Sequence, residues 1–265
     1  MTKCLNCGNT FEGNFCPHCG QKAATKRLKL KEIVMDTVNS FVGGDNKFMR
    51  TCQDLCIRPG HMVREFLIGH RAKYYNPLQV YVYTITLYAI FSYIFGVSSS
   101  FLDNIVDVDL DAKDIEYASI GIVFEYLKAI YSNKLYGTLL TASLSAISYQ
   151  LIFRKYKILR SDGMMLPLNI TEQFYTQLYE SCITMIITIF LLPFCLIPSI
   201  ESHTKLFYEI SSISVSIILY KQLLGIGWIK STILNIIATA ITFIIFVILL
   251  LLVIGVGAGI EGAMK

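Results

Sequence analysis

Four cysteines near the start of the chain have the spacing of a metal site. The pattern is Cys4-x2-Cys7-x8-Cys16-x2-Cys19, within the stretch "CLNCGNTFEGNFCPHCGQK". Zinc prefers four tetrahedral ligands, and thiolates are its usual structural ligands. Each Cys-x-x-Cys turn places two sulfurs on one side of an ion, and the second turn closes the cage. The spacing therefore predicts a zinc ribbon over residues 1–22, with Zn2+ as a structural cofactor.

A closed four-cysteine site leaves no open position for water or substrate, so we expect it to be structural. A unit of about 20 residues cannot bury enough apolar surface to fold alone, so metal binding and folding would be one event. Gly8 and Gly20 follow the two turns at the same offset, where positive φ is expected. Phe11 and Phe15 are expected to pack beside the metal. A redox dithiol pair and an iron centre are the alternatives.

A second group of chemically capable residues lies in "NITEQFYTQLYESC", just before an apolar run. Polar and acidic side chains at membrane depth are costly and often mark a pathway or relay. In the cytoplasmic interface the same side chains would cost little, and both placements stay open from the sequence. The residues of this possible intramembrane polar site are Glu172, Gln173, Tyr175, Tyr179 and Glu180.

The composition indicates that a membrane positions these residues. Apolar residues make up 54% of the 265 residues and charged residues 16%, whereas soluble domains carry roughly 25% charged residues. Several apolar runs reach the length of about 20 residues that a helix needs to cross a bilayer. We predict a mostly α fold, a polytopic α-helical membrane bundle of about five spans with the small Cys4 ribbon at its N-terminus. The expected spans are 78–95, 135–153, 181–200, 206–225 and 231–254, and the fourth is the weakest.

The segment between ribbon and first span is basic. Residues 1–75 hold 12 Lys or Arg against 6 Asp or Glu. Apolar residues at helical spacing predict amphipathic helices whose basic faces contact an anionic lipid surface or a protein partner. A small helical layer with a solvated charged face is the alternative, and nucleic acid is disfavoured because the ribbon has no basic-aromatic patch. The residues expected to make these contacts are Arg58, Arg64, His70, Arg71 and Lys73.

Charge asymmetry predicts the topology. The first 27 residues contain no apolar signal region, so the N-terminus is expected in the cytoplasm. Counting Lys and Arg around each span then places the C-terminus in the periplasm of a bacterial inner membrane. If 206–225 does not cross, the C-terminus would be cytoplasmic. The expected domains are the ribbon (1–22), cytoplasmic amphipathic basic helices (23–75) and a transmembrane helical domain (76–265).

Four blocks of the sequence resemble an uncharacterised bacterial family of integral membrane proteins with a zinc ribbon, domain-of-unknown-function family 3667. The blocks are the ribbon itself, "RPGHMVREFLIGHRAKYYNPLQ", "EQFYTQLYES" and "LLGIGWIKSTILN". The resemblance implies an N-terminal metal ribbon followed by a body with several spans. It implies no activity.

These observations favour a non-enzymatic membrane adaptor or assembly factor. Its ribbon and basic helices would dock a cytoplasmic or membrane protein partner, or lipid. The chain contains no phosphate-binding loop, nucleophile elbow or His-Glu-x-x-His motif, and therefore none of the sequence signatures of those enzyme classes. The alternative is a small-solute or lipid transporter, which would use the polar residues around Glu172 and Glu180.

Overall fold

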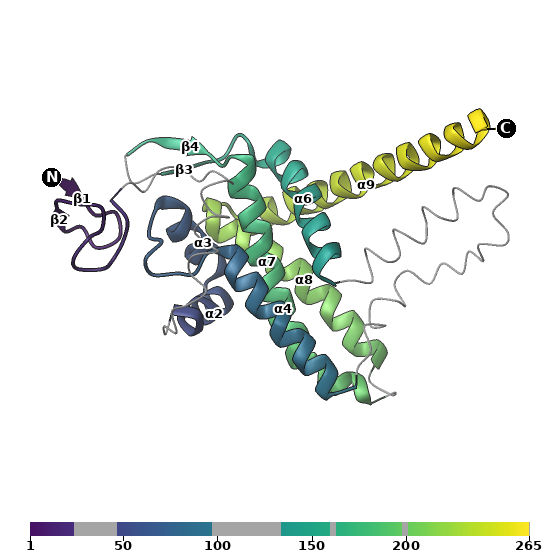
Figure 1. Ribbon diagram of the computed structural model, residues 1–265, viewed down its shortest axis with the longest axis horizontal. Coiled ribbons are helices and arrows are strands. Elements are labelled where there is room, and N and C mark those ends of the chain that lie inside the picture. The colour runs from purple at the N-terminus through teal and green to yellow at the C-terminus, as the bar shows by residue number, and fades with distance from the viewer. Residues whose placement is uncertain (24–46, 97–133, 160–162, 198–200, 265) are drawn as a thin grey trace.

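The computed structural model describes residues 1–23, 47–96, 134–159, 163–197 and 201–264 of the chain. This part is mostly helical, as predicted, with two small two-stranded sheets (Figure 1). The N-terminal unit that contains the four cysteines (residues 1–23, the Cys unit) lies at one end of the molecule. Helix α9 extends beyond the other helices (Figure 1). The helices are α2 (Lys47–Ile57), α3 (Pro59–Ile68), α4 (Pro77–Ile94), α6 (Lys134–Phe153), α7 (Ile170–Leu191), the 3-10 helix η3 (Leu192–Leu196), α8 (Glu201–Leu224) and α9 (Trp228–Met264).

The two sheets are short antiparallel pairs. β1 (Thr2–Lys3) pairs with β2 (Thr10–Phe11) around the first Cys-x-x-Cys turn. β3 (Lys157–Leu159) pairs with β4 (Met165–Pro167) after α6. Sequence reasoning missed this second hairpin. The Asp-Gly dipeptide between its strands is a turn signal that could have identified it.

Asparagine side chains start the two helices that contain the first and third predicted spans. At α4, Asn76 and Gln79 form a capping box, and Pro77 occupies the first turn, where its missing N–H costs no hydrogen bond. At α7, the Asn169 side chain accepts from the Glu172 backbone N–H at 2.8 Å, and the Glu172 carboxylate accepts from the Asn169 N–H at 2.8 Å. These caps satisfy N–H groups that a helix start leaves without partners.

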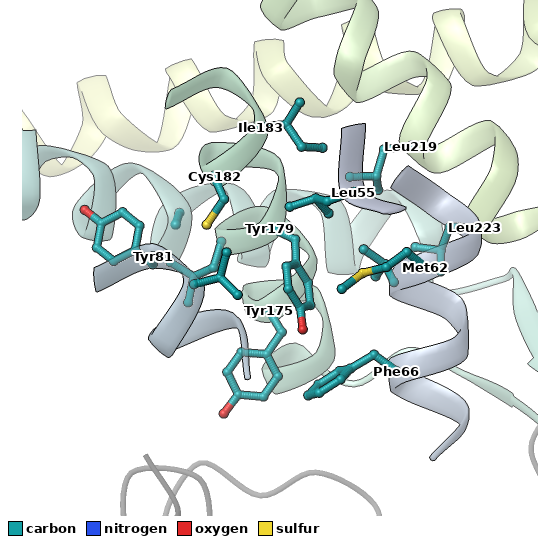
Figure 2. Packing of buried hydrophobic residues seen from close by; sticks show 14 of the residues in the cluster. Leu55, Met62, Phe66, Tyr81, Tyr175, Tyr179, Cys182, Ile183, Leu219 and Leu223 are labelled. Carbon is teal, nitrogen blue, oxygen red and sulfur yellow. The ribbon is translucent and has the colours of Figure 1, made fainter. Parts of the chain in front are cut away.

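Helix α7 is the centre of the helical body. It packs against α2, α3, α4, α6 and α8, and it contributes Tyr175, Tyr179, Cys182 and Ile183 to one continuous cluster of buried residues. Figure 2 shows these side chains facing residues of α2, α3 and α8, such as Met62. The helices that precede the first predicted span therefore share one core with the apolar helices that follow.

Helices α3 and α8 cross at Gly60. The Gly60 N–H donates to Gln222 Oε1 at 3.0 Å. A Cβ at position 60 would collide with the carbonyl oxygen of Leu219 and would lie 2.6 Å from the backbone nitrogen of Leu223. Glycine is needed here because the two backbones touch, so no side chain could move aside to make room.

Within the described residues, three helical segments are long and apolar enough to cross a membrane. They are Pro77–Ile94, Ile170–Leu196 and Trp228–Leu252, which correspond to the first, third and fifth predicted spans. The third begins earlier than predicted, because the polar stretch from Ile170 onward belongs to the same helix as the apolar run. The other two predicted spans are helices too, α6 and α8, but they are not among these three segments.

Helix α9 leaves most of its apolar surface uncovered. It has 37 residues and so extends about 55 Å at the usual rise of a helix. Only 11% of its apolar window is buried within the chain, and side chains such as Phe243 and Ile244 are more than half exposed. Such a surface requires lipid or another apolar cover.

Candidate functional site

The four N-terminal cysteines converge as the spacing predicts. Their sulfur atoms all lie within 4.8 Å of one another. Cys4 and Cys19 Sγ are 3.5 Å apart, and Cys7 and Cys16 Sγ are 3.6 Å apart. A tetrahedral zinc–thiolate site separates its sulfurs by about 3.8 Å, given Zn–S bonds of about 2.3 Å. The four thiols could therefore hold one ion and supply a complete tetrahedral set.

The two cysteine turns repeat the same backbone pattern. Gly8 N–H donates to the Cys4 carbonyl at 2.9 Å, and Gly20 N–H donates to the Cys16 carbonyl at 2.8 Å. Both glycines have the expected positive φ, 76° and 71°. Desolvation raises the pKa of the Cys19 thiol, but hydrogen bonds from the Asn6 side chain and other neighbours outweigh it and lower the pKa to about 6. A backbone hydrogen bond from Asn9 lowers the pKa of the neighbouring Cys7 thiol, but desolvation and hydrogen bonds to the other three cysteines outweigh it and raise the pKa to about 12. Without a metal, the cluster therefore favours a thiolate at Cys19 and a thiol at Cys7, and metal binding would release the remaining protons.

Only one of the two phenylalanines of the unit packs as predicted. Phe11 is buried with Cys4 and Cys16 in a small cluster, but Phe15 is 57% exposed, so its predicted packing was wrong. Phe15 pairs with Lys22 in extended backbone, where successive side chains point to opposite sides. Because the next residue, Cys16, points inward, Phe15 points outward.

A hydrogen bond joins the Cys unit to the helical body. The Ala72 backbone N–H donates to Gln21 Oε1 at 3.2 Å, and Gln21 is buried. Ala72 lies between α3 and α4, in the segment that carries the predicted contact residues Arg71 and Lys73. The unit and this basic segment are therefore neighbours in the structure.

Arg58 and Lys73, two of the five predicted contact residues, form a compact ionic cluster with Asp54, Glu65 and Tyr74. Arg58 pairs with Asp54 at 2.9 Å and with Glu65 at 3.0 Å, and Lys73 pairs with Glu65 at 3.0 Å. The Tyr74 hydroxyl lies 2.7 Å from Glu65 Oε2 and 2.9 Å from Asp54 Oδ2. Two cations and two carboxylates cancel, so this cluster adds no net positive charge to the surface.

The carboxylates of the cluster are stabilised in their charged form. A hydrogen bond from Arg58 is the main reason why the pKa of Asp54 lies below its usual value. Burial opposes ionisation of Glu65, but hydrogen bonds from Tyr74 and Lys73 outweigh it and lower its pKa. Both groups are therefore charged at neutral pH.

The other three predicted contact residues are half-buried: Arg64, His70 and Arg71. The Arg71 guanidinium lies 6.0 Å from the centre of the Phe66 ring, a cation–π arrangement. Their contact with lipid or a partner stays a prediction.

The polar residues of α7 lie inside the helical body. Glu172 is fully buried and serves as the capping partner of Asn169. Gln173 Oε1 accepts from the Tyr220 hydroxyl at 2.8 Å, and Gln177 Nε2 donates to the same hydroxyl at 3.0 Å. Two glutamines one turn apart therefore bracket a single tyrosine of α8.

The two predicted tyrosines of α7 are also fully buried. The Tyr179 hydroxyl donates to the Tyr75 carbonyl at 2.6 Å and so ties α7 to the start of α4. The Tyr175 hydroxyl is buried, with no hydrogen-bond partner in the described ranges. The structure thus brings Gln173 and Tyr179 into separate inter-helix hydrogen bonds rather than into one shared site.

Glu180 lies apart from these groups, at a polar cavity between α6, α7 and α8. The cavity has a volume of about 210 Å³. Its lining includes Thr141 and Ser145 from α6 and Ser181 and Thr184 from α7. Sequence reasoning identified Glu180 but not the α6 side of the cavity, because nothing in the sequence shows which faces of two helices meet.

A further buried polar group joins α6, α8 and α9, and sequence reasoning missed most of it. The Tyr149 hydroxyl donates to Asn235 Oδ1 at 3.1 Å, and the Ser216 hydroxyl donates to the same oxygen at 2.8 Å. The Asn235 amide donates to the Ser231 carbonyl at 2.9 Å. This network fixes the first half of α9 against the bundle.

The fold and the cysteine cluster define a class: a mostly helical protein with, in its described ranges, three candidate membrane spans and a possible metal site near its N-terminus. The family model described as "Protein of unknown function (DUF3667)" matches residues 45–89, so this segment of the chain is similar to that uncharacterised family. The matched residues contain the whole ionic cluster around Arg58. No curated protein and no solved structure matches the chain.

Proposed function

We propose that this chain is a non-enzymatic integral membrane protein whose N-terminal Cys unit, folded around structural Zn2+, docks a cytoplasmic or membrane protein partner, or lipid, as an adaptor or assembly factor. The observation that carries the proposal is the convergence of the four thiols within 4.8 Å. They supply all four positions of a tetrahedral ion, which is typical of a structural site.

The surface of the Cys unit supports a docking role. Phe15 and Met1 are large apolar side chains that stay exposed on the unit, 57% and 96% respectively. The unit also meets the basic segment through Gln21 and Ala72. A partner could therefore contact the unit and the half-buried side chains of Arg64, His70 and Arg71 together.

Crosslinking in native membranes tests this proposal. A photoreactive amino acid at Phe15 should give a discrete adduct with one protein or with lipid, which mass spectrometry distinguishes. The same probe in a Cys4→Ser background should lose that adduct, because the unit no longer folds. A probe at Ile57, an exposed position on α2, is the matched control. An identical adduct with and without Cys4, or no adduct from Phe15, contradicts the docking role.

We propose further that the chain crosses a bacterial inner membrane five times, with the N-terminus in the cytoplasm and the C-terminus in the periplasm. Helices α6 and α8 have 20 and 24 residues, and lengths of about 30 and 36 Å are sufficient for a hydrocarbon core of about 30 Å. An added C-terminal cysteine should react with a membrane-impermeant thiol reagent in intact cells. Protection of that cysteine favours four crossings instead.

A small-solute or lipid transporter is the second candidate. The observation in its favour is the amount of polar material buried among the helices, including Gln173, Tyr220 and Asn235. Substituting Glu172 and Glu180 and measuring uptake into liposomes tests this function. Because Glu172 also caps α7, loss of flux counts only where the substituted protein keeps its wild-type thermal midpoint.

A further inference from the structure

The cavity beside Glu180 has the properties of a binding site rather than a packing defect. Its volume of about 210 Å³ far exceeds the 10–15 Å³ needed to hold one water molecule. Glu180 is ten residues beyond the first residue of α7, so it lies roughly 15 Å along a helix that is long and apolar enough to cross a membrane. A polar cavity of this size at such a depth needs a polar occupant.

Five of the hydroxyl groups that line the cavity already donate their proton to the backbone of their own helix. Thr141 donates its proton to the Gly137 carbonyl, Ser181 to the Gln177 carbonyl and Thr184 to the Ser181 carbonyl, at distances of 2.9 to 3.0 Å. Ser145 and Thr188 donate to carbonyls of their own helices in the same way. A hydroxyl has one proton and two lone pairs, so a hydroxyl bonded to its own helix can only accept from a ligand.

Glu180 adds a carboxylate oxygen without a donor. Its Oε2 atom is buried and has no hydrogen-bond partner in the part of the chain that the structure describes. The hydroxyl of Ser216, on the neighbouring helix α8, donates to Asn235 Oδ1 at 2.8 Å. A buried carboxylate without a partner is strongly unfavourable, and a cation beside it would remove much of that cost.

The described residues that line the cavity include no Lys, Arg or His. No cationic side chain among them therefore pairs with Glu180. We propose that this cavity binds a small organic cation bearing N–H groups, such as an ammonium or amidinium ion, with the Glu180 carboxylate as counter-ion and the surrounding hydroxyl oxygens as acceptors. The site is independent of the Cys unit, and it holds whether or not that unit docks a partner.

Three molecules of nearly equal size and shape test the proposal on the unmodified protein. They are acetamidinium, acetamide and acetate, which carry one positive charge, no charge and one negative charge. Titration calorimetry on the full chain in detergent should show saturable binding of acetamidinium. Acetamide and acetate should bind at least about tenfold more weakly, because a hydrogen bond to a charged group contributes roughly 1.5–3 kcal/mol. Equal binding of all three, or no saturable binding of acetamidinium, overturns the proposal.

A pair of matched variants then assigns the site. Glu180→Gln keeps the shape of the side chain and should weaken acetamidinium binding at least about tenfold. Glu209→Gln removes the same charge from an exposed position on α8, and it should leave the affinity unchanged. Undiminished binding by a folded Glu180→Gln protein assigns the cation to another place and contradicts the proposal. If that variant does not fold, the three-ligand comparison still decides the question.

Discussion

The N-terminal Cys unit and the helical body keep their shapes by different physical means. In the Cys unit the buried core consists of Cys4, Phe11 and Cys16, with Cys19 and Ala23 packed beside it. In the body, one continuous cluster joins α2, α3, α4, α6, α7, α8 and α9, and it includes Tyr175, Tyr179 and Tyr220. The first region has almost no apolar core and depends on its thiols, whereas the second is held by packing and inter-helix hydrogen bonds. Each region should therefore respond to a different perturbation.

Metal removal should have the largest effect, and it should be confined to one region. Cys4→Ser, or treatment with a strong chelator, is expected to unfold residues 1–23, because structural zinc contributes roughly 10 kcal/mol or more to such a unit. Elemental analysis should show loss of zinc, and limited proteolysis should cut the unit while α2 to α9 stay intact. Cys56→Ser, at an exposed cysteine of α2, is the control. Full zinc occupancy in the Cys4 variant would show that the ligand set is wrong.

Gly60→Val should give the largest effect in the helical body. The added side chain meets backbone atoms of Leu219 and Leu223, so α3 must move away from α8. We expect a loss of about 3 kcal/mol of stability, the upper end for overpacking, measured by unfolding in mixed detergent. Gly227→Ala is the control, because a Cβ there meets nothing within 4 Å. Zinc content should not change. A wild-type midpoint for Gly60→Val would contradict the close crossing of the two helices.

Tyr179→Phe should have a smaller effect in the same region. The substitution removes the hydroxyl that donates to the Tyr75 carbonyl at 2.6 Å and leaves a buried acceptor without this partner. The expected loss of stability is about 2 kcal/mol, read from the same unfolding experiment. Tyr93→Phe, at a tyrosine that is 89% exposed, should change nothing. If the two variants behave alike, the hydrogen bond between α7 and α4 does not stabilise the body.

The smallest of the expected effects is the loss of stability when acid weakens the ionic cluster around Arg58. The pKa values of Asp54 and Glu65 are lowered in the folded protein, so their contribution is present above the unfolded pKa values of about 4. This contribution to stability is lost as the pH falls through the lower pKa values that the two carboxylates have in the folded protein. Because the Arg58 side chain is 37% exposed, solvent screening keeps the effect below about 1 kcal/mol.

A double variant separates the contribution of the Asp54 and Glu65 carboxylates to stability from that of all other titrating groups. Asp54→Asn with Glu65→Gln cannot lose these charges, so its thermal midpoint should fall less steeply below about pH 4 than that of the wild type. Protonation of the metal ligands is common to both proteins and cancels in the comparison. Parallel pH profiles would show that the cluster does not contribute to acid stability.

The metal site illustrates what local sequence determines. The spacing of Cys4, Cys7, Cys16 and Cys19 closes two turns over a few residues each, and Gly8 and Gly20 supply the positive φ that those turns require. Helix positions were also predictable, since long apolar runs and the caps at Asn76 and Asn169 are encoded within each segment. In these cases the residues that interact are close in sequence, so spacing alone constrains the geometry.

Contacts between helices were decided only by the tertiary structure. The ion pairs of Arg58 with Asp54 and Glu65 form only once α2 and α3 fold together, and its contact with lipid or a partner stays a prediction. The glutamines of α7 meet Tyr220, more than 40 residues away, and the cavity at Glu180 forms where three helices leave space between polar faces. Helical periodicity shows which residues share a face, but the rotation and crossing of each helix depend on packing along its whole length. For this reason the convergence of the four cysteines that could hold a metal ion and the positions of most helices follow from the sequence, whereas only the assembled bundle determined which polar groups meet.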